Sequence, residues 1–223
     1  MPLGEADRIV TLMTEGHGRV RAVAKGIRRT TSKFGSRLEP TTHVAVQLYV
    51  GRELDTITQA ETIAHMPNMR DDLHRFGRAN VMLETVDQVS PEKEPNPPLY
   101  RMLVGALTEL DTADAPLVLA GFLLKLLALE GFQPQLDMCV ACGTTDDLVA
   151  FDIDDGGLRC RNDRRGIALD PDAIALMRQM LGGELAVALR EPPSAATAEA
   201  EAVAIGLVEH HIERRLKAAR TRL

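Results

Sequence analysis

Aromatic side chains are scarce in this 223-residue sequence, which has no tryptophan, two tyrosines and five phenylalanines. Its core must therefore be filled by Leu, Val, Ile, Ala and Met, and a hydrophobic fraction of 45% supplies enough of them. The length suffices for one large domain or two small ones. The shortage also limits function, because a surface that binds single strands by stacking bases on aromatic rings has few residues available.

Cysteines and long apolar runs are scarce as well. Three cysteines and a charged start without an apolar leader argue for a reducing compartment, so we expect a cytoplasmic protein without disulfides. The longest apolar run, 117–129, is interrupted by Lys125 and is too short to span a bilayer. It predicts a buried helix whose lysine reaches solvent or a carboxylate. No nucleotide-binding or hydrolase motif occurs, so we expect a protein that is not an enzyme.

Acidic residues are absent from one segment, although they outnumber basic residues in the whole chain, whose formal net charge is -6. Residues 1–52 hold nine basic and four acidic residues, a net +5, which leaves -11 for the remainder. Residues 19–37, the basic segment, contain no acid. A field of one sign acts within about 10 Å, so this segment predicts a polyanion-binding site, with a plain solvated surface as the alternative. The candidate nucleic-acid contacts are Arg19, Arg21, Lys25, Arg28, Arg29, Lys33 and Arg37.

The first part of the chain, up to residue 64, reads as strands. Residues 8–14 are β-branched and apolar, and apolar and polar residues alternate in 19–25 and 43–50, which predicts short antiparallel strands around a long loop at 26–40. In the segment that begins at Arg19, Val20 and Ala22 would face the core while the arginines face outward. The four predicted strands are 8–14, 19–25, 43–50 and 54–60.

From residue 67 the hydrophobic period becomes helical. Pro116 and Gly131 bracket the apolar run, Asp170 caps a helix that ends at Gly182, and Ser194 caps a long helix that runs toward Arg222. Two more helices are expected within 73–86 and 99–110. The predicted fold class is therefore α+β, with a strand domain at 1–64 and a helical domain at 65–223.

The cysteines have the spacing of a metal-binding knuckle within residues 137–165. Cys139 and Cys142 form a C-x-x-C pair, Cys160 follows after 17 residues, and Asp163 stands where a second pair would have its last cysteine. Thiolates and a carboxylate all ligate zinc, so the first interpretation is a structural zinc site. A loop that packs without metal and a redox-active thiol pair stay open as alternatives. A zinc deaminase is excluded because the H-x-E motif follows the cysteines instead of preceding them.

The phrases "LGEADRIVTLMTEGHGRVRAVAKGIRRTTSKFGSRLEP" and "QLYVGRELDTITQAE", with "ACG" and "GLRC" in the cysteine segment, resemble the RecO family of bacterial DNA repair and recombination mediators. The resemblance covers nearly the whole chain. It implies an N-terminal OB-fold, which is a five-stranded barrel, and a helical domain with a zinc knuckle. Family members usually have a strand before the "LGEADRIV" phrase, which begins here at residue 3. We therefore expect the first barrel strand to be missing, through either a truncated start or a natural short form.

The same resemblance implies partners. Members of the family bind single- and double-stranded DNA and anneal complementary strands. With RecR they help RecA load onto DNA covered by the single-strand-binding protein SSB, and they recognise the acidic SSB tail. This chain would then be a non-enzymatic, nucleoid-associated mediator that has no membrane partner and meets the DNA backbone through the basic segment. Two other classes stay open: a zinc-stabilised RNA-binding or ribosome-associated module, and a protein-interaction scaffold.

Overall fold

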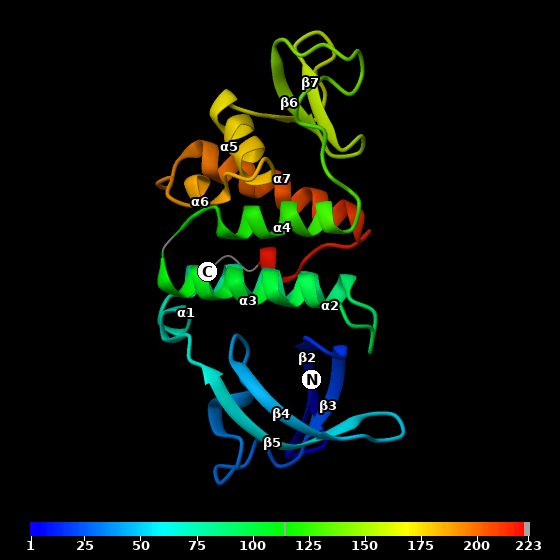
Figure 1. The fold of residues 1–223 in the computed structure, drawn as a ribbon, viewed down its shortest axis with the longest axis vertical. Coiled ribbons are helices and arrows are strands. Elements are labelled where there is room, and N and C mark those ends of the chain that lie inside the picture. The colour runs from blue at the N-terminus through cyan, green and yellow to red at the C-terminus, as the bar shows by residue number, and fades with distance from the viewer. Residues whose placement is uncertain (114, 221–223) are drawn as a thin grey trace. The chain divides into compact units, whose positions relative to one another are not determined.

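The computed structural model describes residues 1–113 and 115–220, and the chain divides into two compact units, with the boundary along the sequence between residues 111 and 112. The first unit holds a large sheet and three helices, and the second holds the other helices and a small sheet (Figure 1). The domain division predicted after residue 64 follows the end of the large sheet. The first compact unit also includes the three helices that follow this sheet, so its boundary lies later in the chain than residue 64.

Five strands form the sheet of the first unit. They are arranged in the order β1-β2-β3-β5-β4, and β3 and β5 are its parallel pair. A five-stranded sheet with this crossed order is the Greek-key barrel of an OB-fold, so the predicted α+β fold class is confirmed. The strands are β1 (Pro2–Leu3), β2 (Asp7–Thr14), β3 (Gly18–Ala24), β4 (His43–Tyr49) and β5 (Asp55–Ala64).

The first strand is shortened, not missing as the sequence had suggested. Pro2 and Leu3 pair with Arg8 and Asp7, and the Ile9 N–H donates to the Met1 carbonyl at 2.7 Å. The Met1 ammonium donates in return to the Ile9 carbonyl at 2.8 Å. Two residues cannot show an alternating pattern, so only the pairing reveals this strand.

The barrel core is built from one face of the strands. Ala22, Ala24 and Ile57 face inward, and Phe34 and Leu38 reach the same core from the connection between β3 and β4. Phe34 is 1% exposed, and Leu38 ends the short 3₁₀ helix η1 (Gly35–Leu38). The connection is thus held to the barrel by its own apolar residues, and its polar residues remain outside.

Three helices complete the first unit: α1 (Pro67–Asp71), α2 (Leu73–Val89) and α3 (Pro97–Thr112). The Asp72 carboxylate caps α2 by accepting from the N–H groups of His74 and Arg75. His43 of β4 and the hydroxyl of Tyr100 in α3 lie at hydrogen-bond distance, 2.9 Å. The unit therefore joins strands and helices through polar contacts.

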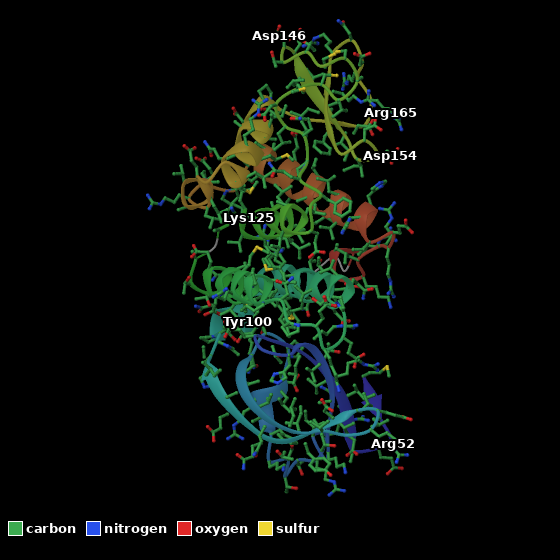
Figure 2. All side chains as sticks on the ribbon, turned by 45° about the vertical axis from the view of Figure 1, so that its right-hand side comes forward. Arg52, Tyr100, Lys125, Asp146, Asp154 and Arg165 are labelled. Carbon is green, nitrogen blue, oxygen red and sulfur yellow. The ribbon has the colours of Figure 1, made fainter. Side chains whose placement is uncertain are left out.

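The second unit is centred on α4 (Val118–Leu129), which packs against α5 (Pro171–Leu181) and α7 (Ala195–His211). The predicted caps Asp170 and Ser194 are both in place. Lys125 is only partly buried, as the run around it predicted; Figure 2 marks its position. Within the described residues no helix is long and apolar enough to cross a membrane.

The last long helix ends earlier than predicted. It stops at His211, and Glu213 has a positive φ of 50° that turns the chain. The buried Glu209 carboxylate holds this turn, because it accepts from the Leu216 N–H at 2.8 Å and pairs with Arg215 at 2.7 Å. Arg222, the predicted end point, lies outside the described residues.

The cysteine segment contains strands that periodicity did not predict. They form a sheet in the order β7-β6-β8, made of β6 (Leu148–Asp152), β7 (Gly157–Cys160) and β8 (Ile167–Ala168). The short helix α6 (Leu185–Ala188) follows α5. These strands are two to five residues long, too short for alternation to identify them.

Candidate nucleic-acid interface and metal centre

The basic segment runs along β3 and into the connection that follows it. Val20, Ala22 and Ala24 are buried on the inner face of β3, so Arg19 and Arg21 project from the outer face. The structure therefore separates the seven predicted contacts into groups with different surroundings.

Arg19 is engaged by the protein itself. Its Nη1 lies 2.9 Å from Oδ1 of Asp87 in α2, and its side chain is 24% exposed. The backbone carbonyl of Arg19 also accepts from the Lys93 N–H at 2.8 Å. These contacts favour a structural role for Arg19, because the Asp87 carboxylate already neutralises its charge.

Four other cations have no such partner. Arg21 is partly buried, and Lys25, Arg28 and Arg29 are exposed. Within the described parts of the chain, none of these four side chains forms an ion pair. The backbone beneath them is held, since the Gly26 N–H donates to Asp7 Oδ1 at 2.7 Å and the Arg28 N–H donates to the Ala6 carbonyl at 3.0 Å. Unneutralised charge on a fixed backbone suits an anionic ligand.

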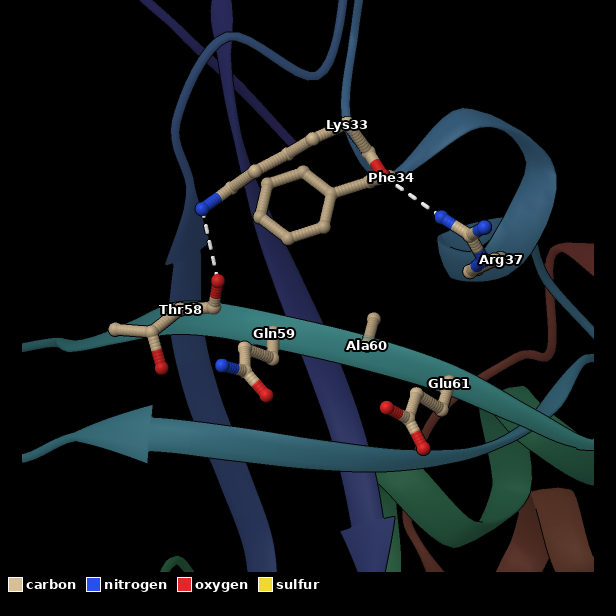
Figure 3. Close-up of a pocket in the computed structure, with 7 residues that line it drawn as sticks. All are labelled: Lys33, Phe34, Arg37, Thr58, Gln59, Ala60 and Glu61. Atoms are coloured by element: carbon tan, nitrogen blue, oxygen red, sulfur yellow. Dashed lines mark hydrogen bonds between the residues drawn. The ribbon is translucent and has the colours of Figure 1, made fainter.

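Lys33 and Arg37 line an open cavity of about 300 Å³ beside β5 (Figure 3). Lys33 Nζ donates to the Thr58 carbonyl at 2.8 Å and lies 5.1 Å from the ring centre of Phe34. Arg37 Nη1 donates to the Lys33 carbonyl at 2.7 Å. Both cations keep further N–H donors free, since an ammonium carries three and a guanidinium five.

The opposite wall of this cavity was not predicted. It is formed by residues of β5 that include Gln59 and Glu61, both exposed. Neither residue belongs to a recognisable motif, and only the pairing of β5 beneath the connection brings them near Lys33. The two cations can donate hydrogen bonds to a phosphate, and the Glu61 carboxylate on the opposite wall can accept a hydrogen bond from a base.

The four predicted metal ligands lie together. One ligand atom from each of Cys139, Cys142, Cys160 and Asp163 falls within 4.8 Å of all the others. The sulfurs of Cys142 and Cys160 are 3.8 Å apart, and Cys160 Sγ is 3.5 Å from Asp163 Oδ2. Tetrahedral zinc with bonds of about 2.3 Å to sulfur and 2.1 Å to oxygen would place its ligands about 3.8 Å and 3.6 Å apart. These residues could therefore hold a metal ion.

The thiols of this cluster share protons unequally. Burial acts to raise the pKa of Cys139, but the backbone N–H groups of Cys160, Cys142 and Ala141 outweigh it and lower the pKa to about 7. The pKa of Cys142 is raised to about 12: the Thr144 backbone acts to lower it, and the side chains of Asp163, Cys139 and Cys160 together outweigh that effect. Cys139 is thus the thiol that ionises first as pH rises, and a thiol must be deprotonated to bind a metal ion.

A buried carboxylate lies in the β6–β7 hairpin, which also carries Cys160. Asp152 is 3% exposed and lies 3.0 Å from Arg159 and 3.3 Å from Arg165. Burial acts to raise the pKa of Asp152, but these two arginines and the Asp155 backbone lower it. Arg165 also pairs with Asp154 at 2.8 Å at the surface of the hairpin (Figure 2). Sequence reasoning missed this network because its carboxylates and arginines match no motif.

A five-stranded barrel of OB topology, a helical part and a metal-ligand cluster define an OB-fold protein with an α-helical extension. Residues 1–66 match the family described as "Recombination protein O N terminal", and residues 70–220 match "Recombination protein O C terminal". The chain therefore belongs to the RecO family, which places it in DNA repair and recombination.

Two relatives agree with this assignment. A protein of Nocardioides sp. named "DNA repair protein RecO" is 44% identical over 225 residues, covering 96% of this chain and 91% of that protein. One of the same name from Frankia casuarinae is 42% identical over 223 residues, covering 97% and 91%. The predicted family is confirmed.

Proposed function

We propose that this chain is a non-enzymatic mediator of recombinational repair that binds single- and double-stranded DNA through the phosphate backbone. The observation that carries the proposal is a set of four cations on a barrel of OB topology that have no ion partner among the described residues, namely Arg21, Lys25, Arg28 and Arg29. Lys33 and Arg37 extend this surface along β5. Lysine and arginine on phosphates supply affinity that does not depend on sequence.

Backbone binding also suits strand annealing. A protein that holds phosphates leaves the Watson–Crick edges of the bases free, so two coated strands can still pair. We extend the proposal to the partners that family membership suggests, namely RecR, the acidic tail of SSB and, through them, RecA. The measurement is titration of a labelled SSB-tail peptide with and without its terminal Phe; equal binding of the two peptides would contradict recognition of that tail.

We further propose that zinc is the metal of the cysteine cluster and that its role is structural. The three thiols and Asp163 fill a tetrahedral set and leave no position for a substrate. When bound, zinc would cross-link the turn at Cys139 to β7 at Cys160. Elemental analysis of the purified protein tests occupancy and should find about one zinc per chain.

The test of the main proposal is binding of the full chain to an oligonucleotide across a salt series. Six phosphate contacts predict a slope of log K against log salt of about -4 on single strands, at about 0.7 per contact. Single strands of unrelated sequence should bind alike. Absence of salt-dependent binding would refute the proposal and favour the scaffold alternative.

Competition with RNA separates the remaining alternative. A backbone-dominated DNA surface has no group that requires a 2′-OH, so RNA of the same sequence should compete no better than DNA. A clear preference for RNA would favour the RNA-binding or ribosome-associated function.

A further inference from the structure

The hairpin between β4 and β5 displays apolar side chains that phosphate binding does not explain. Tyr49 ends β4 and is 69% exposed, and the next residue, Val50, is 74% exposed. The chain has only seven tyrosines and phenylalanines in total, all of them described, and Phe132 is the one other exposed ring. Phe132 contacts the ring of His211, whereas the Tyr49 ring lies in solvent, where its flat faces are accessible.

The register places Tyr49 on the outer face of the barrel. Leu48, one residue earlier, packs against the core, so the Tyr49 side chain points the opposite way. Tyr49 pairs with Thr56 of β5, and Thr56 pairs with Val23 of β3. Paired residues share a face, so Tyr49 lies on the same face as Arg21, which stands two residues before Val23. Tyr49 is on β4, and β5 lies between β4 and β3, so the distance from β4 to β3 is two strand spacings, or about 10 Å.

The tip of the hairpin adds no net charge. Arg52 and Glu53 are adjacent and both exposed, so their charges offset each other toward a distant phosphate. Figure 1 shows this hairpin extending from the barrel beside β5, and Figure 2 marks Arg52 at its end. Within the described residues the Tyr49 side chain has no hydrogen bond, ring contact or cation contact. The hairpin therefore offers an unoccupied ring beside a cationic surface.

We propose that Tyr49 is a stacking site for one unpaired nucleobase of a strand whose phosphates lie on the basic segment. The inference rests on the proposed DNA binding and adds strand selectivity to it. Every base has a π-face, so one stacked base does not introduce sequence preference. A base inside a duplex is already stacked on both sides, so it gains nothing from Tyr49. The site would favour unpaired DNA over paired DNA, which phosphate contacts alone cannot do.

Three variants test the proposal: Tyr49→Ala, Tyr49→Phe and, as a matched control for removal of an exposed ring elsewhere, Phe132→Ala. Each is bound to oligo(dT), to an abasic strand of equal length and to a duplex. Tyr49→Ala should weaken oligo(dT) binding at least about 5-fold and leave the abasic strand and the duplex unchanged. Its salt slope should equal that of the parent, because no phosphate contact is lost. Tyr49→Phe and Phe132→Ala should bind oligo(dT) like the parent.

Fluorescence gives a second readout, because the chain has no tryptophan and Tyr49 is one of two tyrosines. Oligo(dT) should quench a tyrosine signal that is absent from Tyr49→Phe, and the duplex should not quench it. The stacking site is refuted if Tyr49→Ala binds oligo(dT) like the parent, or if it loses affinity equally for all three ligands. Failure of the parent chain to bind any DNA would instead refute the proposed function, so the two failures are distinguishable.

Discussion

Removing charge at Arg28 and Arg29 tests the DNA surface most directly, because the structure predicts how two kinds of arginine differ. Both side chains are exposed and have no ion partner among the described residues, whereas Arg19 is bound to Asp87 at 2.9 Å. Arg28→Gln with Arg29→Gln should therefore remove phosphate contacts without disturbing the fold. Arg19→Gln should lower the stability of the fold modestly and leave the phosphate contacts.

The magnitude follows from counterion release. Two lost contacts lower the slope of log K against log salt by about 1.4 on single strands and by about 1.8 on duplex DNA. Extrapolated from a common value at 1 M salt, the double variant should bind single strands about 14-fold more weakly at 0.15 M. Arg19→Gln should keep the parental slope and lose about 1 kcal/mol of unfolding free energy, a modest cost because the Asp87 side chain is 40% exposed and can be solvated.

The assay is fluorescence anisotropy with a labelled single strand at several salt concentrations, with thermal unfolding measured on the same samples. Circular dichroism confirms that each variant is folded. A parental slope in the double variant would refute the placement of the site. A slope lowered by Arg19→Gln as much as by the double change would refute the division between engaged and free arginines.

Three further changes test other parts of the structure. Cys142→Ser should lower the zinc content and the melting temperature, while its DNA affinity stays within about twofold of the parental value. A large loss of DNA affinity in the folded variant would contradict a purely structural role for the cluster. Asp152→Asn removes the buried carboxylate that pairs with Arg159 and Arg165 but leaves each arginine a second carboxylate, so it should cost about 2 kcal/mol of unfolding free energy at pH 7. The pKa of Asp152 is lowered in the folded state, so its contribution to stability is present above the unfolded pKa of about 3.9 and is lost as pH falls through the folded value. The stabilities of the variant and the parent should therefore converge in acid, as measured by circular dichroism. A stability difference that stays constant with pH would contradict this. Gly18→Ala should lower the melting temperature by several degrees, since Gly18 has a φ of +64° and a Cβ there would overlap the Glu94 carbonyl, whereas Gly16→Ala meets open space and should unfold like the parent.

Local patterns were sufficient for much of this protein. Alternation predicted β3 and β4, because one face of each strand packs into the barrel and the other does not, and β-branched composition and a turn predicted β2 and β5. The caps Asp170 and Ser194 were recognisable because a helix start is satisfied by its own neighbours in sequence. The cysteine spacing indicated a ligand set that includes Asp163, since a C-x-x-C turn and its counterpart are each only a few residues long.

Tertiary structure alone decided what these elements do together. The parallel pairing of β3 with β5 and the two-residue β1 depend on contacts between segments, and no local period encodes them. The charge of the basic segment was evident from the sequence, but which of its cations can bind an anionic ligand was not. Asp87 lies 68 residues beyond Arg19, so only the packing of α2 shows that this arginine is neutralised, whereas Arg28 and Arg29 have no ion partner in the part of the chain that the structure describes. Likewise, only the register of β4 and β5 places Tyr49 on the outer face, because a shift of one residue would turn the same ring into the core.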